Sequence, residues 1–383
     1  MENSKEEKIS IWNGTFAIRN LQKRMSERNN KSYIKYSWFL MGMVFLVILA
    51  GGVVRMTQSG MGCPDWPTCF GMWIPPMEAS QLPADFEKYL SQQDIDHTFN
   101  AYHTWIEYIN RLLGALLGVF IFGYSVWTSI KFSSSRSRMK TLLLSDLVLT
   151  VCLIIFAILG LSMLLKIFGL VFILLALYSL YFAVRYTTRR SIVVVSILLL
   201  IAVAVQGWLG KMVVDENLSV VKITIHMIGA LVIAALPLIN INTLSANRLE
   251  VSSLIKHGSS AMIIVLLIQI ILGTQVREEI DVISKALSYE NRELWIERLG
   301  NIFFIHRSFS WIVLLGVIGL YFKGRAIPSY MPYIRNILLV LFVIILLGII
   351  MTYMNMPSIA QPLHLLFASA LLMQLFYSRL KMN

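Results

Sequence analysis

Residues 337–351 read Ile337-Leu338-Leu339-Val340-Leu341-Phe342-Val343-Ile344-Ile345-Leu346-Leu347-Gly348-Ile349-Ile350-Met351, without one charged side chain. The apolar run around them, 333–353, has about the 20 residues that a helix needs to cross a ~30 Å hydrocarbon core. It lacks the alternation of apolar and polar residues that marks a barrel strand. Because a backbone in lipid must satisfy its own hydrogen bonds, this run predicts a membrane-spanning α-helix.

Nine further runs of the same kind occur along the chain. We therefore expect an all-α, polytopic membrane bundle of ten spans, near residues 34–55, 104–130, 141–164, 167–187, 191–213, 220–243, 258–277, 299–322, 333–353 and 358–378. The composition agrees, since 57% of the 383 residues are hydrophobic and 14% are charged, whereas soluble proteins carry about 25% charged residues. Nuclear, DNA-binding and secreted proteins are thereby excluded, and the lipid bilayer is the expected surrounding.

Positive charge is concentrated on one side of the predicted bundle. The formal net charge is +12, and about two thirds of the Lys and Arg residues precede the first span or lie in every second loop, which the positive-inside rule makes cytoplasmic. The surplus charge therefore reports topology and predicts no nucleic-acid partner. Residues 1–33 are polar, so we expect no cleavable signal peptide and a multi-pass protein of the inner (cytoplasmic) membrane, with both termini inside.

Two of the three cysteines, Cys63 and Cys69, lie in the first outer loop, and two prolines separate them. On the oxidising face of a membrane such a pair is expected to form a disulfide. Three interpretations stay open: a loop staple, a redox-active pair that relays electrons, or a metal site, which lacks neighbouring histidines. Cys152 lies within an apolar run and is expected to be a small core residue.

Three histidines lie in apolar surroundings at one common depth near the outer ends of their spans: His226, His306 and His364. Ionisable groups inside a span are costly and by default mark a functional site. For a single histidine, a hydrogen bond to a neighbouring helix is an equally good interpretation. Three histidines at one depth favour a functional site over separate structural hydrogen bonds.

Recurring spacings indicate an internal repeat. Gly210 precedes His226 by 16 residues, and Gly348 precedes His364 by the same distance. Two short motifs also recur: Ile109-Asn110-Arg111 corresponds to Ile305-His306-Arg307, and Val54-Arg55 corresponds to Val276-Arg277. We therefore expect a cytoplasmic tail (1–33), an N-terminal half (34–243) that contains an inserted hairpin at 141–187, a cytoplasmic linker (244–257) and a C-terminal half (258–383). Duplicated bundles commonly place cofactors between facing helices.

In the C-terminal half, His306 and His364 are predicted to face a common interior from two helices. Two imidazoles on opposing helices are the usual axial ligands of a b-type haem. No Cys-x-x-Cys-His motif occurs in the chain, so any haem would be bound without a covalent link.

In the N-terminal half the corresponding pair is Asn110 and His226, and asparagine is a poor iron ligand. Glu107 lies on the same helical face as Asn110, and a carboxylate within a span is costly unless it is paired or functional. Arg111 is expected to point about 100° away and to be a poor partner for Glu107. The closed histidine pair therefore suits electron transfer, and the site with His226 and Glu107 suits chemistry.

Four arginines lie near the outer ends of spans, where their guanidinium groups either hold haem propionates or extend to the membrane interface. They are Arg55, Arg111, Arg277 and Arg307.

These residues together resemble the haem A synthase family, also called the haem O oxygenase family. The resemblance is carried in order along nearly the whole chain by Gly51-Gly52-Val53-Val54-Arg55, Gly62-Cys63-Pro64-Asp65-Trp66-Pro67, Glu107-Tyr108-Ile109-Asn110-Arg111, Gln206-Gly207-Trp208-Leu209-Gly210, His226, Gly273-Thr274-Gln275-Val276-Arg277, His306-Arg307 and His364.

The resemblance implies two successive oxidations of a methyl group of haem O, which yield the formyl group of haem A for terminal oxidases. It implies haem b as a cofactor on His306 and His364, and substrate haem beside His226 with Glu107 as the acidic residue of the reaction. It further implies a haem O supplier (a farnesyltransferase), terminal oxidase assembly as the destination, and an electron donor that the sequence does not identify. Some members carry the Cys63–Cys69 pair as a disulfide.

Two features depart from that family. Many members have histidine where this chain has Asn110, which leaves the substrate iron singly ligated unless His103 contributes. His103 lies seven residues away, roughly 10 Å along a helix, too far to occupy the same coordination point. The family plan has eight spans, and the hairpin at 141–187 adds two.

Two other functions use the same histidines. A cytochrome b that only transfers electrons gives Glu107 no chemical role. A transporter built on duplicated halves uses the histidines in a proton relay.

Overall fold

The computed structural model describes residues 30–91, 99–216, 220–245 and 247–383. Within these ranges the chain is almost entirely helical, and nine helices are long and apolar enough to cross a membrane. The expected polytopic helical bundle is confirmed. The predicted cytoplasmic tail falls largely outside the described residues.

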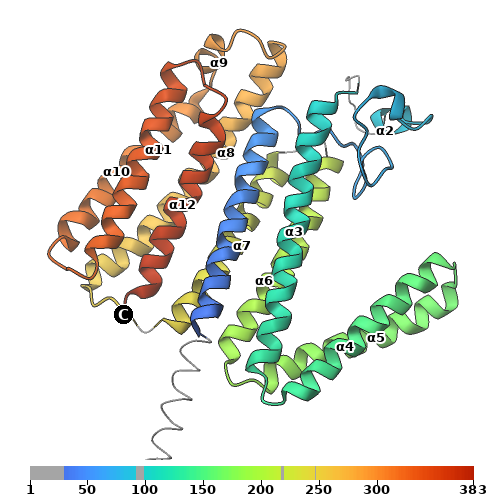
Figure 1. Ribbon diagram of the computed structural model, residues 1–383. Coiled ribbons are helices and arrows are strands. Elements are labelled where there is room, and N and C mark those ends of the chain that lie inside the picture. Colours follow the sequence, from blue (N-terminus) through green and yellow to red (C-terminus); the bar gives the residue numbers. More distant parts are fainter. Residues whose placement is uncertain (1–29, 92–98, 217–219, 246) are drawn as a thin grey trace, which may run out of the picture.

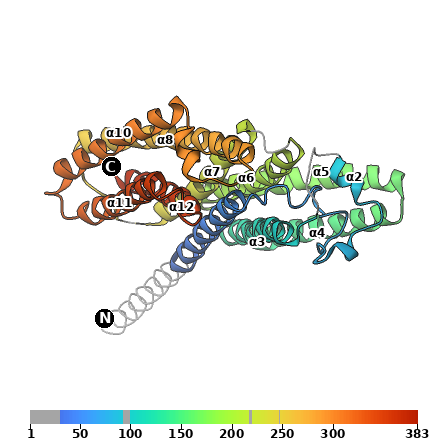
Figure 2. The same ribbon diagram turned by 90° about the horizontal axis from the view of Figure 1, so that it is seen from above.

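The long helices form two groups of four, which lie side by side (Figures 1 and 2). The first group consists of the helix Asn30–Met56, α3 (Ala101–Phe132), α6 (Arg190–Asp215) and α7 (Val220–Leu244). The second group consists of α8 (Ser253–Ala286), α10 (Asn301–Gly324), α11 (Met331–Tyr353) and α12 (Ala360–Lys381).

Three short helices lie at the end of the bundle opposite the C-terminus: η1 (Ala79–Gln81), α2 (Glu87–Ser91) and α9 (Glu293–Glu297). By the predicted topology this is the outer end, since the C-terminus is expected inside. The loop with Cys63 and Cys69 lies at this same end and covers the start of α3.

The inserted hairpin consists of α4 (Arg136–Ile158) and α5 (Ser162–Arg185). The two helices pack mainly on each other, and in Figure 1 they slant away from the bundle. The turn comes about five residues earlier than expected, because Gly160 adopts a positive φ of 68° that ends α4. Helix α4, which corresponds to the expected span at 141–164, is not among the nine apolar helices.

A buried polar cluster holds the inner end of the first group together. The amide of Asn240 on α7 donates to the hydroxyls of Tyr33 and Tyr124, both at 3.2 Å, and Ser37 bonds the Tyr124 hydroxyl at 2.8 Å. All four side chains are fully buried. Because an unsatisfied polar group is costly in an apolar interior, these bonds fix the relative positions of three helices.

The two groups meet through two contacts that the repeat relates to each other. Gly52 approaches Pro362 of α12 so closely that a methyl group at position 52 would lie 2.9 Å from the proline Cβ. Thr224 of α7 and Thr274 of α8 bond through their hydroxyls at 3.0 Å. Gly52 and Thr274 are equivalent in the repeat, because they follow Gly51 and Gly273. Pro362 and Thr224 are equivalent as well, because each precedes a histidine, His364 or His226, by two residues. The halves therefore pack with approximate two-fold symmetry.

Candidate functional site

Each of the three interior histidines faces a glycine of a neighbouring helix. A methyl group added at the glycine would lie 3.2–3.7 Å from Cε1 of the imidazole, in the pairs Gly210–His226, Gly273–His306 and Gly348–His364. A fourth pair lies at the equivalent place in the first half. A methyl group added at Gly51 would lie 4.0 Å from the Oδ1 atom of Asn110. The structure thus relates these four positions by the repeat and gives three of them an imidazole.

One polar atom at each of these four positions lacks a partner, although the Nε2 atom of His306 lies 3.5 Å from the Nε2 atom of Gln269. The Nδ1 atoms of His226, His306 and His364 and the Oδ1 atom of Asn110 are buried without a hydrogen bond to any described residue. Buried polar atoms in folded proteins are nearly always bonded, so an exception needs an explanation. Four exceptions at equivalent places indicate a site for a ligand rather than structural hydrogen bonds between helices.

One cavity of about 2490 Å³ connects the four positions. Its walls come from both groups of helices and include Glu107, Asn110, His226, His306 and His364. Sites for one drug-sized molecule measure about 300–1,000 Å³, so this cavity has room for more than one such ligand. The residues that the sequence singled out therefore share one interior space.

Two glutamines stabilise the helices that carry the histidines. The Nε2 atom of Gln206 donates to the carbonyl of His226 at 2.8 Å, and that of Gln269 donates to the carbonyl of His306 at 3.1 Å. Each glutamine precedes a facing glycine, Gly210 or Gly273, by one helical turn. The sequence analysis missed Gln269, although the shared spacing of glutamine and glycine was available as a signal.

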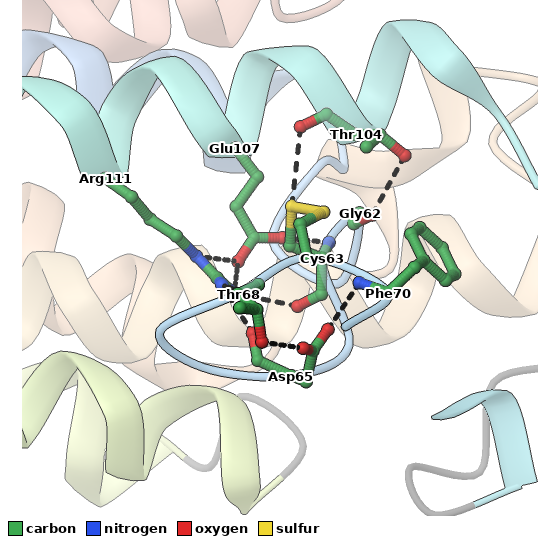
Figure 3. Close-up of polar contacts among 9 residues, drawn as sticks. Gly62, Cys63, Asp65, Thr68, Phe70, Thr104, Glu107 and Arg111 are labelled. Carbon is green, nitrogen blue, oxygen red and sulfur yellow. Dashed lines mark hydrogen bonds and ion pairs between the residues drawn. A yellow bond between two sulfur atoms is a disulfide. The ribbon is translucent and has the colours of Figure 1, made fainter. Parts of the chain in front are cut away.

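Glu107 on α3 is 4% exposed and lies against the outer loop. Its Oε2 atom accepts a hydrogen bond from the backbone N–H of Cys63 at 2.8 Å, and its Oε1 atom accepts from Arg111 at 2.5 and 3.1 Å (Figure 3). The expectation that Arg111 is a poor partner for Glu107 was wrong. Residues four apart lie one above the other on a helix and are well placed to form an ion pair.

Arg111 also binds the outer loop. Its guanidinium donates to the carbonyls of Cys63 at 2.7 Å, Asp65 at 2.5 Å and Thr68 at 3.1 Å. The Asp65 carboxylate accepts from Thr68 and from the backbone N–H of Phe70 (Figure 3). The loop, the arginine and the carboxylate therefore form one connected polar unit.

Cys63 and Cys69 are joined by a disulfide, and both are fully buried. The expected pairing is confirmed. The sulfurs are bonded to each other, and the Cys63 backbone lies directly on Glu107, so the disulfide belongs to the structure that positions this carboxylate.

The four arginines have different surroundings. Arg55 and Arg277, equivalent in the repeat, both bind the carboxylate of Asp281, at 2.5 and 2.8 Å. Arg277 also donates to Gln361 at 2.6 Å, whereas Arg307 is exposed and lies 3.4 Å from the Tyr353 hydroxyl. Asp281 was missed because α8 continues to Ala286, beyond the span predicted to end at 277.

His103 lies nearer the outer end of α3 than Asn110. Its Nδ1 atom is 3.0 Å from the hydroxyl of Ser59, and Gly62 packs directly on its backbone. The side chain lines the same cavity, and its ring also packs against that of Tyr102.

The fold and this layout define a multi-pass helical membrane protein with a duplicated bundle and histidines facing one interior cavity. A family model, COX15-CtaA, described as "Cytochrome oxidase assembly protein", matches residues 35–166 and 163–376, and the chain belongs to this family.

Curated relatives match over shorter stretches. The chain is similar to proteins named "Heme A synthase" from Rhodospirillum centenum (31% identity over 115 residues, 27% of this chain and 30% of the relative), Shewanella oneidensis (32% over 91 residues, 23% and 26%) and Paracoccus denitrificans (37% over 84 residues, 20% and 22%). The matched stretches span less than a third of either protein.

Proposed function

We propose that this protein is a membrane oxidoreductase that converts haem O to haem A by oxidising a porphyrin methyl group to a formyl group. Membership of the family supports this assignment, as do relatives that carry the name "Heme A synthase". The observation that carries it is the difference between the two halves of the cavity. One half has two imidazoles, and the other has one imidazole and a buried, oriented carboxylate.

The residues of the second half fit a haem b cofactor. His306 and His364 approach one cavity from α10 and α12, each with a buried ring nitrogen that has no partner among the described residues. Gly273 and Gly348 leave space beside the two rings. Haem b bound there would supply one-electron transfer. His306 and His364 would hold this group through their imidazole nitrogens.

In the first half, substrate haem would be bound by His226, and Glu107 would serve the reaction. Oxidation of a methyl group breaks C–H bonds, and a positioned carboxylate can take part in the proton transfers that accompany this step. The backbone N–H of Cys63 and the guanidinium of Arg111 hold the Glu107 carboxylate in one orientation at the cavity wall. The disulfide-bonded loop covers this end of the cavity and limits the access of water.

The arginines between the halves suit the acidic side chains of haem. Arg55 and Arg277 line the cavity and both bind the carboxylate of Asp281, and Glu278 is a second acidic residue near Arg55. A propionate is a carboxylate, and guanidinium groups bind carboxylates through paired, charge-assisted hydrogen bonds.

The same proposal places the protein in the inner membrane with both termini in the cytoplasm. Haem O would come from a farnesyltransferase, and haem A would pass to terminal oxidase assembly. The outer-half position of His226 and Glu107 then puts the chemistry near the outer face of the membrane.

The direct test is to produce the protein in cells that make haem O but no haem A, and to separate the extracted haems by chromatography. We expect haem A or its hydroxylated precursor in the extract, together with haem b. A folded, haem-loaded protein that yields neither product would falsify the assignment.

A further inference from the structure

Asn110 breaks the repeat at the one place where the first half would otherwise have a second imidazole. At the three other equivalent positions, a glycine faces a histidine ring at 3.2–3.7 Å from its potential methyl group. At the fourth, Gly51 faces the amide of Asn110 at 4.0 Å. The first half therefore has the facing glycine, Gly51, but it has Asn110 where the repeat predicts a histidine.

The amide of Asn110 is a poor substitute for that ligand. Imidazole nitrogen is a good donor for iron, whereas a neutral amide oxygen is the kind of ligand that hard cations such as Mg²⁺ or Ca²⁺ prefer. The Oδ1 atom is nevertheless buried and without a partner among the described residues. A polar group is thus held in the apolar cavity at the place where an axial ligand would stand.

His103 does not fill this gap. It lies two turns from Asn110, roughly 10 Å along the helix. Its ring is bonded to Ser59, and its backbone is packed against Gly62, so the segment after the first helix holds it in place. Movement of this ring to the position of Asn110 would require unwinding of the start of α3.

We propose that the haem in the first half is held by one protein ligand, His226, and that the coordination position beside Asn110 is open to a small diatomic ligand. The second half, with His306 and His364, has no such position. This inference rests on the proposed function, because it takes the occupant of the first half to be a haem. It goes further by assigning ligand binding to one half of the cavity only.

Carbon monoxide is the probe for this assignment. The intact protein, purified with both haems bound, is reduced and exposed to carbon monoxide, and the difference spectrum is recorded. The oxidised protein is examined by electron paramagnetic resonance. We expect one high-spin and one low-spin haem in the oxidised protein, and carbon monoxide binding to one haem of the two.

Three variants sharpen the experiment. Asn110→His restores the imidazole and is expected to abolish the high-spin signal and carbon monoxide binding. Asn110→Ala removes the amide, keeps the position open and is expected to retain both. Asn336→His makes the same substitution as the first variant at an exposed site near the inner end of α11 and is expected to change neither.

Two results would overturn the inference: a wild-type protein with both haems low-spin and no carbon monoxide binding, or an Asn110→His protein that still binds it. An Asn110→His protein that does not fold will also lose the low-spin signal of the second half. In that case the spin states of the wild-type protein alone test the open coordination position. Extraction of haem from the same samples reports the proposed function separately. Haem A without carbon monoxide binding refutes only the inference, whereas binding without haem A refutes only the reaction.

Discussion

At the scale of single residues, the pair Glu107–Arg111 organises the outer end of the first half. The carboxylate is almost fully buried, and the guanidinium is 14% exposed. A buried ion pair is a weak source of net stability, but removal of one partner leaves the other charge buried and uncompensated. This pair therefore fixes a geometry more than it adds to the free energy of folding.

Replacement of Arg111 by Ala tests that statement. It leaves the Glu107 carboxylate without its cation and three loop carbonyls without their donor, so we expect a loss of about 3–5 kcal/mol in unfolding free energy. The measurement is denaturant-induced unfolding in detergent. Lys211→Ala is the matched control, because Lys211 and Asp215 have the same spacing but are 41% and 43% exposed. Exposed pairs contribute about 0–1 kcal/mol, and equal losses in the two variants would contradict the account.

The glycines that face the histidines allow a second residue-scale prediction. A leucine at Gly273 would enter the space beside His306, where even a methyl group would lie 3.2 Å from the ring. Overpacking of about 1–3 kcal/mol corresponds to roughly 5- to 150-fold weaker haem binding in the second half. The low-spin haem absorbance per protein measures this loss.

The control for that prediction is Gly319→Leu on α10. Position 319 is exposed, and a side chain there meets open space. The control protein is expected to keep its full haem content. Normal haem content in the Gly273→Leu protein would show that the space beside His306 is not used by a ligand.

Single residues also differ in how far the sequence predicts their position and partners. Apolar run length and spacing predicted His226, His306, His364 and Glu107 as site residues, and the structure places all four around one cavity. The pairing of Glu107 with Arg111 was not predicted: neighbouring residues of a helix point about 100° apart, but residues four apart lie on the same face. Asp281 was not predicted as a site residue, because its helix continues beyond the hydrophobic span. Hydropathy marks only the part of a helix that lies in the membrane.

At the scale of elements, the hairpin α4–α5 packs mainly on itself, and only its base joins the core of the bundle, through Met139, Phe182 and Ala183. The backbone N–H of Thr188 donates to the carbonyl of Phe132 at 2.8 Å, and the N–H of Ser134 donates to the carbonyl of Tyr186 at 2.8 Å. The end of α3 and the start of α6 therefore lie next to each other at the base of the hairpin.

This arrangement predicts that the hairpin can be removed. Replacement of residues 134–186 by a short glycine and serine linker should leave the packing of α3 against α6 intact, because the two ends are already in contact. We expect unchanged haem spectra and a moderate decrease in yield. Loss of the first-half haem with retention of the second would instead assign the hairpin a role in the substrate site.

At this scale the sequence predicted well where length and hydropathy decide. The positions of the long helices and the inserted hairpin follow from apolar run length. The early turn at Gly160 did not, because a left-handed glycine within an apolar run has no compositional mark that separates it from a glycine inside a helix.

At the scale of the whole molecule, the duplicated bundle explains why two unlike sites share one cavity. Related contacts, Gly52 with Pro362 and Thr224 with Thr274, join the halves symmetrically, and Asp281 links Arg55 of one half to Arg277 of the other. The scaffold is thus nearly symmetric, whereas the side chains at its four equivalent positions are not. Under the proposed function, that asymmetry would separate a half that transfers electrons from a half that carries out the oxidation.

Under the proposed function, Glu107 takes part in the reaction, while the second half holds its haem independently of this carboxylate. The most direct measurement compares wild-type and Glu107→Gln proteins, isolated from cells that make haem O, by haem spectrum and by chromatography of the extracted haem. The account predicts an unchanged low-spin haem b spectrum, with haem A reduced by about 10²–10⁴-fold, the usual contribution of a general acid or base. Undiminished haem A in the Glu107→Gln protein would contradict it.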